Sequence, residues 1–329
     1  AALGSGYAGA AVVDSQVFVP HRLGGDELLS AFDLSTGKTL WQTPWPATYR
    51  GGYNEDKGPR CVPTITGDLA VCYDAAGNLV CVRITDGKLL WRRELRQEYE
   101  ADDGYFGAGS APLVVDDLIV VCLGGRLAGV LGVDLATGKT RWKATTYDAS
   151  YAAPIDVSQG GKRRILVVTR FNTLLMDPAT GKVLADKRFG SRGPTVNAAT
   201  PIRIGPDRVF LTASYGIGAA MFRLADDSLV SESIDRTLLG SQYNTPVLAG
   251  DRLIGINGRE DMTAHLRVVD VPTQRVIWEQ RDYGTAHLIS LGDQALSLGI
   301  DGQLELIDVT ADNYSPLATA NLPDGKYRA

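Results

Sequence analysis

The sequence is poor in the residues that most often form catalytic centres. Its 329 residues include only three histidines, four cysteines and three methionines. It contains no H-E-x-x-H zinc motif, no G-x-S-x-G nucleophile elbow and no phosphate-binding loop followed by a helix. These absences argue against the common zinc hydrolases, serine hydrolases and nucleotide-binding enzymes.

Long apolar runs and basic clusters are also missing. No segment reaches the roughly 18 consecutive apolar residues that a membrane-spanning helix needs. Acidic residues outnumber basic ones by 38 to 33, which gives a formal net charge of −5, and the basic residues form no stripe. We therefore expect neither a transmembrane segment nor a nucleic-acid partner.

The cysteines show no metal-binding pattern. Cys61, Cys72, Cys81 and Cys122 have no C-x-x-C spacing and few histidines near them, so a zinc site is not indicated. We interpret them as small buried residues. One alternative stays open, because Cys72 and Cys81 flank a short polar segment and could face each other across a hairpin as a disulfide.

What the sequence does contain is an internal repeat. Five segments align without a gap: AFDLSTGKTLW (31–41), CVRITDGKLLW (81–91), GVDLATGKTRW (132–142), LMDPATGKVLA (175–185) and VVDVPTQRVIW (268–278). A degraded sixth copy is MFRLADDSLVS (221–231), and a seventh unit carries ELIDVTADN at the expected place. The six copies recur every 43 to 51 residues, which is the period of a propeller blade.

Each repeat unit has the pattern of four short β-strands. Alternating and β-branched runs predict strands, and no segment shows a sustained apolar stripe at helical spacing. A four-stranded sheet repeated in tandem leaves two open edges unless the units close into a ring. We therefore predict an all-β fold, a β-propeller of about seven four-stranded blades with almost no helix.

The repeat also sets the expected domain organisation. No linker, charge block or low-complexity tract divides the chain, so we predict a single propeller domain over residues 1–329. The expected repeat units are 7–48, 59–98, 108–148, 150–190, 197–235, 242–283 and 285–322.

The D-x-x-T-G-K segment of the repeat has a mechanical explanation. Its Asp and Thr can hydrogen-bond nearby backbone, and Gly37, Gly87, Gly138 and Gly181 can adopt the positive φ that closes a bulged hairpin. The tryptophan four residues after the glycine, as at Trp41, is expected on the outer strand of its blade. We predict that these rings pack between adjacent blades and do not hold a cofactor.

This repeat is similar to a known one. The pattern A-L-D-x-x-T-G-K-x-x-W, with strand starts such as SAP (110–112), AAP (152–154) and NTP (244–246), resembles the PQQ-like β-propeller repeat. That repeat occurs in quinoprotein dehydrogenases and in the lipoprotein subunit of the bacterial outer-membrane β-barrel assembly machine. The resemblance covers nearly the whole chain and is closest to bacterial PQQ-binding-like repeat proteins, many of them exported and scaffold-like. It implies a periplasmic or otherwise exported protein.

Two departures from that family bear on function. Its members commonly have eight blades, whereas seven units are counted here, so either the ring has seven blades or a terminal blade has been removed. Quinoprotein dehydrogenases also resemble one another in a vicinal Cys-Cys pair stacked on the quinone and a Glu/Asn/Asp set that holds calcium, and this sequence has no adjacent cysteines. We therefore predict no cofactor, because a shared fold is weak evidence for function. PQQ and calcium stay open as alternatives that no vicinal cysteine pair supports.

A functional surface is expected on one face of the propeller. The loops that enter the first strands and those between the second and third strands share this face, around the central channel, and they carry tyrosines and arginines that a filled apolar channel would not select. The predicted partner- or ligand-binding residues are Tyr7, His21, Arg22, Arg60, Ser110, Tyr151, Arg170, Asn197, Tyr215, Tyr243, Asn244 and His287.

This polar, aromatic and locally basic rim has three interpretations. In the first, its side chains are satisfied by one another and by channel water. In the second, they form a protein interface, where Tyr and Arg are enriched, and in the third they bind a small polar or anionic ligand through the planar Arg fork. The acidic segment EYEADDG (98–104) between two blades is interpreted as a solvated loop.

The function favoured by these observations is a non-catalytic binding scaffold. It would present the rim to a partner protein or an envelope component. The alternative is an enzyme that uses the central funnel, such as a PQQ-type quinoprotein oxidoreductase.

Overall fold

The described part of the chain is built almost entirely from β-strands. A computed structural model describes residues 3–53 and 55–328, so the two ends of the predicted 1–329 domain and residue 54 lie outside it. The described residues form seven four-stranded antiparallel sheets, and their only helix is the single turn α1 (Leu95–Glu98). This confirms the expectation of an all-β fold. Nothing helical within these residues is long and apolar enough to cross a membrane.

Each sheet is formed by four strands that follow one another in the sequence. The first four sheets consist of β1 (Ala11–Val13), β2 (Gln16–Leu23), β3 (Asp26–Asp33) and β4 (Thr39–Pro46); β5 (Thr64–Thr66), β6 (Leu69–Tyr73), β7 (Asn78–Arg83) and β8 (Leu89–Glu94); β9 (Leu113–Val115), β10 (Leu118–Cys122), β11 (Val130–Asp134) and β12 (Thr140–Ala144); and β13 (Ile155–Asp156), β14 (Ile165–Val168), β15 (Asn172–Met176) and β16 (Val183–Arg188).

The last three sheets repeat this pattern. They consist of β17 (Ile202–Ile204), β18 (Arg208–Ala213), β19 (Gly218–Ala225) and β20 (Ser228–Asp235); β21 (Val247–Ala249), β22 (Arg252–Asn257), β23 (His265–Asp270) and β24 (Arg275–Gln280); and β25 (Ala286–Leu291), β26 (Gln294–Gly299), β27 (Gln303–Asp308) and β28 (Pro316–Asn321). Every one of the seven sheets lies within one of the seven predicted repeat units.

The backbone contacts divide the chain into two compact units, which are described separately. The first unit comprises the residues up to 170 together with 174–184, and the second comprises 171–173 and 185–328. The single-domain organisation stays a prediction.

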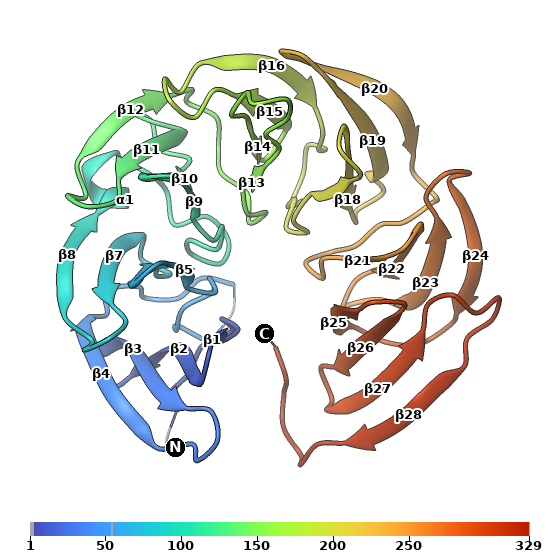
Figure 1. Cartoon of the computed structure of the whole chain (residues 1–329), viewed down its shortest axis with the longest axis horizontal. Helices are drawn as coiled ribbons and strands as arrows, with labels where there is room; N and C mark the ends of the chain where they lie inside the picture. Colours follow the sequence, from blue (N-terminus) through green and yellow to red (C-terminus); the bar gives the residue numbers. More distant parts are fainter. Residues whose placement is uncertain (1–2, 54, 329) are drawn as a thin grey trace. The chain divides into compact units, whose positions relative to one another are not determined.

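Within the first unit the sheets stand side by side, each with its first strand innermost and its fourth strand outermost (Figure 1). Apolar side chains fill the space between successive sheets. Phe18 and Leu29 of the first sheet, for example, form one buried cluster with Ala70 and Val80 of the second sheet. Full burial of a side chain such as Leu or Phe stabilises a fold by about 1.5–3 kcal/mol, so this contact between blades is a main source of stability.

The D-x-x-T-G-K turns close the outer hairpins as predicted. Asp33 Oδ1 accepts the Thr36 N–H at 2.8 Å and the Thr36 hydroxyl at 2.7 Å, and Asp134 Oδ1 accepts the same two groups of Thr137. These hydrogen bonds to the ionised carboxylate lower the pKa of both Asp33 and Asp134 to about 2. The repeated Asp and Thr therefore stabilise one turn conformation.

The repeated tryptophans pack between neighbouring sheets, and the repeated glycines receive them. Trp41 Nε1 donates to Ile84 O at 3.0 Å, and Trp91 Nε1 donates to Leu135 O at 3.0 Å. Gly87 has a φ of +70°, and a Cβ at this position would lie only 2.7 Å from the Trp41 ring. The glycine is therefore needed for two reasons, the left-handed backbone of its own turn and the ring of the preceding blade.

All four cysteines are free thiols, and each is at most 3% exposed. Cys72 on β6 pairs with Val80, and Cys81 on β7 pairs with Val71. Because adjacent positions along a strand point to opposite faces, the Cys72 and Cys81 side chains lie on opposite faces of their sheet. The buried interpretation is therefore confirmed, and the alternative of a hairpin disulfide is wrong.

We expect the native protein to be unreactive toward a water-soluble thiol reagent such as dithionitrobenzoate. All four thiols are shielded from solvent, and burial raises the pKa of Cys81 and Cys122 to about 11, so little thiolate is present at neutral pH. Titration before and after unfolding in guanidinium chloride measures this, and all four thiols should react only after unfolding. Stoichiometric reaction of even one thiol in the native protein would contradict the packing described.

Candidate functional site

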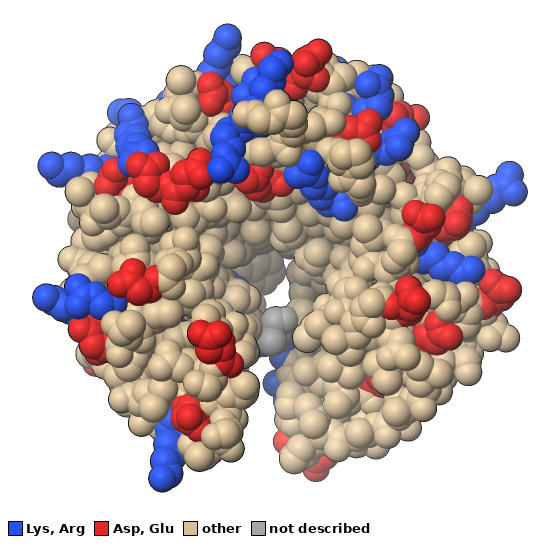
Figure 2. Space-filling view, in the orientation of Figure 1, with Lys and Arg blue, Asp and Glu red and all other residues tan. Residues whose placement is uncertain are grey.

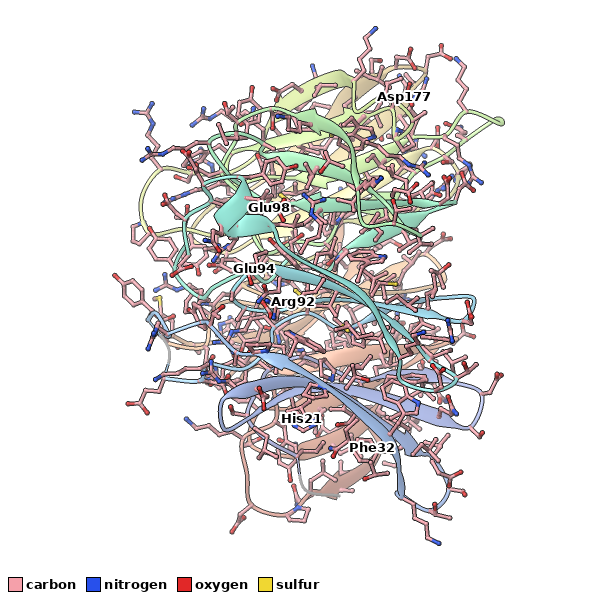
Figure 3. The ribbon with its side chains drawn as sticks, turned by 90° about the vertical axis from the view of Figure 1, so that its left-hand side faces the viewer. His21, Phe32, Arg92, Glu94, Glu98 and Asp177 are labelled. Atoms are coloured by element: carbon pink, nitrogen blue, oxygen red, sulfur yellow. The ribbon has the colours of Figure 1, made fainter. Side chains whose placement is uncertain are left out.

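Loops of two kinds gather at one end of the sheets in each unit. In an antiparallel meander, the loop after the second strand and the connection to the next sheet lie at one end, and the D-x-x-T-G-K turns lie at the other. Figure 3 labels Glu98 of α1 and Asp177 of the turn after β15, which belong to these two ends of the first unit. We call residues 49–53, 99–109, 123–129 and 145–151 the loop face of the first unit.

Two predicted arginines of the first unit hold the connection between the first two sheets. Arg22 Nη1 donates to Tyr49 O at 2.8 Å. Arg60 Nη1 forms an ion pair with Asp56 Oδ1 at 2.6 Å, and its guanidinium lies 4.9 Å from the ring centroid of Tyr7, another predicted residue. The three predicted residues Tyr7, Arg22 and Arg60 therefore lie in one region, where both arginines already have partners within the chain.

His21 lies inside a sheet, whereas the sequence placed it in a loop of the rim. It belongs to β2, is 2% exposed and pairs with Leu28 of β3, and Figure 3 shows it within the first sheet. Its Nδ1 accepts the Gly4 N–H at 3.0 Å, so the proton of the neutral ring is on Nε2, which donates to Ser30 Oγ at 2.8 Å. Burial lowers the pKa of His21 and favours the neutral ring. Both nitrogens are used, so this histidine is part of the framework.

Three further predicted residues fasten backbone segments to one another. Ser110, Asn197 and Asn244 are each 1% exposed. Ser110 Oγ donates to Ala152 O at 2.8 Å, and Asn244 Nδ2 donates to Ala286 O at 2.8 Å. Asn197 Nδ2 also donates to a backbone carbonyl, at 3.0 Å. These hydrogen bonds agree with the interpretation that part of the rim is satisfied internally.

The loop face of the first unit carries a cluster of aromatic rings. The Tyr53 ring centroid lies 5.5 Å from that of Tyr105 and 6.4 Å from that of Phe106, and the Phe106 centroid lies 5.7 Å from that of Tyr151. Arg170 lies beside this group, with its guanidinium carbon 5.5 Å from the Tyr105 centroid. We call Tyr53, Tyr105, Phe106 and Tyr151 the aromatic cluster. Tyr53 is 81% exposed, so the cluster is open to solvent.

Sequence reasoning identified Tyr151 and Arg170 but missed the other three rings. Tyr53, Tyr105 and Phe106 lie in the two longest connections between the described sheets. The acidic residues that precede Tyr105 favoured the interpretation of a solvated loop. The available signal was the adjacent Tyr-Phe pair directly after Asp-Asp-Gly, in an insertion that the other repeats do not share.

A cavity of about 140 Å³ lies beside the aromatic cluster in the first unit. The predicted residues Tyr151 and Arg170 line it, and so do Tyr73 and Arg96, which the sequence did not single out. Tyr73 ends β6, Arg96 belongs to α1 and Arg170 follows β14, so loops and strand ends of the second, third and fourth sheets form the cavity.

The predicted residues of the second unit form two small groups. Tyr215 lines an open depression of about 490 Å³ together with Arg259, whose guanidinium carbon lies 5.1 Å from the Tyr215 ring centroid. Tyr243 donates its hydroxyl to Glu260 Oε2 at 3.0 Å, and its ring centroid lies 5.8 Å from that of His287. Burial is the main cause that lowers the pKa of His287. This histidine is therefore favoured in its neutral form.

Two carboxyl groups are buried in the first unit. Asp74 is 1% exposed and accepts the Trp45 Nε1–H at 2.9 Å, whereas Glu27, also 1% exposed, has no hydrogen-bond partner for either oxygen among the described residues. Burial, with a smaller contribution from Asp74, raises the pKa of Glu27 to about 8, and the charges of Arg22 and Arg60 oppose this rise. Within residues 3–53 and 55–328, no three His, Cys, Asp or Glu side chains are placed to hold a metal ion.

Several solved structures share the fold. BamB from Moraxella catarrhalis superposes with a TM-score of 0.69 at 16% identity, covering 97% of this chain and 88% of that chain. A europium-containing methanol dehydrogenase gives a TM-score of 0.67 at 13% identity, with 98% and 79% covered. The computationally designed protein Ika8 gives 0.67 at 11% identity, with 99% and 89% covered. At these identities the likeness shows the fold alone, and with the seven four-stranded sheets it confirms a seven-bladed β-propeller.

Comparison of the sequence with protein families identifies one of them. None of the curated proteins matches the chain in sequence. The family described as outer membrane protein assembly factor BamB matches residues 25–280, which is more than half of the chain and includes the repeats from 31–41 to 268–278. The resemblance to PQQ-like repeats was based on these same segments. The chain therefore belongs to the family of the outer membrane protein assembly factor BamB.

Proposed function

We propose that the chain is a non-catalytic binding scaffold that uses the loop face of its first unit to bind a partner protein. The aromatic cluster is the observation that carries this proposal, because Tyr53 is 81% exposed and packs against Tyr105 and Phe106. Tyr and Arg are enriched at the energetically dominant positions of protein interfaces. Rings that are already held by neighbours also lose less conformational entropy on binding.

The charge distribution at the end of the sheets opposite the loop face does not indicate a nucleic-acid or lipid partner. The face drawn in Figure 2 carries the D-x-x-T-G-K turns, and on it Lys and Arg side chains are interspersed with Asp and Glu side chains without a large area of one sign. Many of these charges pair with each other, as Arg141 does with Asp117 and Asp134 at 2.5 Å each. A surface of mixed charge lacks the single-sign field that attracts nucleic acids or acidic lipids.

The family supports a particular kind of partner. Its description names an outer membrane protein assembly factor, and BamB of M. catarrhalis has the same fold. We therefore propose that the chain is exported to the cell envelope, needs no cofactor, and binds another protein that takes part in assembling outer-membrane proteins.

Site-specific photo-crosslinking tests this proposal. A photoreactive phenylalanine analogue is placed at Tyr53 or Tyr105 in the loop face, and at Leu34 as a matched control. Leu34 is 55% exposed but lies in a D-x-x-T-G-K turn at the opposite end of the first sheet. In intact cells we expect a discrete adduct from positions 53 and 105 and none from position 34. Mass spectrometry of the adduct should identify an outer-membrane assembly protein.

The same experiment distinguishes specific binding at the aromatic cluster from non-specific crosslinking. With the crosslinker at position 53, the variant Tyr105→Ala should reduce the adduct, because Tyr105 holds the neighbouring ring of Tyr53. Equal crosslinking from positions 34, 53 and 105 would contradict the proposal. So would a PQQ-dependent dehydrogenase activity of the purified chain in the presence of calcium, which is the result expected of the enzymatic alternative.

A further inference from the structure

The cavity beside the aromatic cluster of the first unit has a polar lining. It measures about 140 Å³, which is room for a few water molecules or one small functional group. The residues that line it include two tyrosines, Tyr73 and Tyr151, and two arginines, Arg96 and Arg170. These side chains present hydrogen-bond donors and positive charge in a small space.

The Tyr73 hydroxyl is the clearest sign that the cavity is built for a ligand. Tyr73 is 2% exposed, and its hydroxyl has no hydrogen-bond partner among the described residues. A buried hydroxyl without a partner is destabilising, so native structures rarely keep one unless a ligand or water completes it. The phenol also stays protonated, because burial raises the pKa of Tyr73, and it can therefore donate.

Arg96 presents one edge of its guanidinium to the same space. Its Nη1 is bonded to Asp103 Oδ1 at 3.1 Å, whereas its Nε is buried and has no partner among the described residues. The Arg96 side chain is 9% exposed, but that of Asp103 is 68% exposed, so water screens the carboxylate much more than the guanidinium. The fork formed by Nε and Nη2 is therefore left to bind two acceptor oxygens.

The acidic residues near the cavity stand at its mouth. Asp102 and Asp148 belong to the lining, but both are exposed to solvent. Their charges are screened by water, while the Arg96 charge lies in a region of lower dielectric constant. The inner part of the cavity therefore favours an anion.

We propose that this cavity binds a single carboxylate group. A carboxylate is planar and presents two oxygens at the spacing of the Arg96 fork. One of these oxygens can also accept a hydrogen bond from the Tyr73 hydroxyl. The group is small enough for the volume, and it supplies the acceptors that Arg96 Nε and the Tyr73 hydroxyl lack.

The carboxylate can belong to a free small molecule or to a bound polypeptide. The second source rests on the proposed function, because Tyr151 belongs both to the cavity lining and to the aromatic cluster. A polypeptide lying on the cluster could thus place a terminal carboxylate in the cavity. The chemistry in the cavity is the same in both cases.

Binding can be followed at the Arg96 Nε–H resonance by NMR. The purified chain is titrated with sodium acetate at constant ionic strength, with sodium chloride as the reference. In a second arm it is titrated with the peptide acetyl-Gly-Gly-Phe and with its C-terminal amide. We expect a saturable shift of the Arg96 signal with acetate, and a shift with the acid peptide but not with the amide. An acetate response without a peptide response supports a free small carboxylate as the ligand.

Two variants test the residues assigned to the site. Tyr73→Phe removes only the hydroxyl that lacks a partner, so the variant should fold normally while acetate binds about tenfold more weakly. Arg92→Gln is the matched control, because Arg92 is a nearby arginine on β8 that pairs with Glu94 and does not line the cavity (Figure 3). It should leave acetate binding unchanged.

The proposal fails if acetate does not shift the Arg96 signal, or if Tyr73→Phe binds acetate as well as the unchanged chain. Its outcome is separable from that of the proposed function. Acetate binding without crosslinking at positions 53 and 105 would support the carboxylate site and contradict the protein interface. Crosslinking at these positions without acetate binding would support the interface and contradict the carboxylate site.

Discussion

Replacing Glu27 with glutamine should stabilise the protein at neutral pH and remove part of its pH dependence. Glu27 lies on β3, is 1% exposed and offers two carboxylate oxygens that have no hydrogen-bond partner among the described residues. An ionised carboxylate in such a place is strongly disfavoured, whereas the amide is neutral and of the same shape as the protonated acid. The variant therefore keeps the packing of the neutral form at every pH.

The sign of the effect follows from the raised pKa of Glu27. The pKa is about 8 in the folded chain, against 4.5 for an ordinary glutamate. Between these values the folded state holds a proton that the unfolded state has released, so the free energy of unfolding falls as the pH rises through this window. The shift corresponds to about 3 kcal/mol at pH 7. The charges of Arg22 and Arg60 favour the ionised form of Glu27, and those of Asp74 and Asp56 disfavour it. The raised pKa of Glu27 includes the effects of all four charges.

Urea unfolding at pH 5, 7 and 8 measures this effect. The gain from Glu27→Gln should be small at pH 5 and grow to about 3 kcal/mol at pH 7. Asp33→Asn provides a control of opposite sign, because hydrogen bonds from Thr36 and Ser35 lower the pKa of the exposed Asp33 to about 2. Its loss of stability should therefore be equal at all three pH values. A gain from Glu27→Gln that is also independent of pH would show that Glu27 is ionised in the folded chain.

The fold could be predicted because each residue of the repeat has a local mechanical role. Asp134 and Thr137 fix the turn, Gly138 supplies its positive φ, and Trp91 of the preceding sheet packs on that glycine. These contacts depend on residues that recur at a nearly constant spacing. Alignment of the sequence with itself was therefore enough to place every sheet within its repeat unit.

The candidate site could be predicted only in part, because it depends on segments that do not repeat. Tyr53 and Tyr105 lie in different insertions, and nothing in the spacing of the repeat brings their rings together. Tyr151 and Arg170 were found because they stand at positions that recur in other units. The unpaired Tyr73 hydroxyl could not be found from sequence, since satisfaction of a hydroxyl is a property of three-dimensional packing.

The position of His21 shows how strand length affects such predictions. β2 runs through Leu23, so His21 lies within the ladder to β3 and not in the loop that follows. One face of this strand is buried, and a polar residue there needs internal partners, which Gly4 and Ser30 supply. A polar residue near the expected end of a strand therefore indicates a surface site only if the strand ends before that residue.

Replacing Gly181 with alanine should destabilise the protein strongly. Gly181 has a φ of +73°, and a Cβ there would lie 2.5 Å from the ring of Trp142. The ring is also confined by Gly132, where an added Cβ would lie 2.2 Å from it, and by the hydrogen bond that Trp142 Nε1 donates to Pro178 O at 2.7 Å. Backbone strain and overpacking together give an expected loss of about 2–5 kcal/mol.

Gly37→Ala is the matched control for this variant, because Gly37 stands at the same place in the first repeat and has a φ of +66°. No atom lies within 4 Å of the position that its Cβ would occupy. This variant should therefore show the backbone strain alone, about 1–2 kcal/mol. Urea unfolding of both variants separates the two effects, and the excess loss in Gly181→Ala measures the contact with Trp142. Equal losses would mean that the ring can shift after all, and that the repeated glycine is required by the turn and not by the packing of one blade on the next.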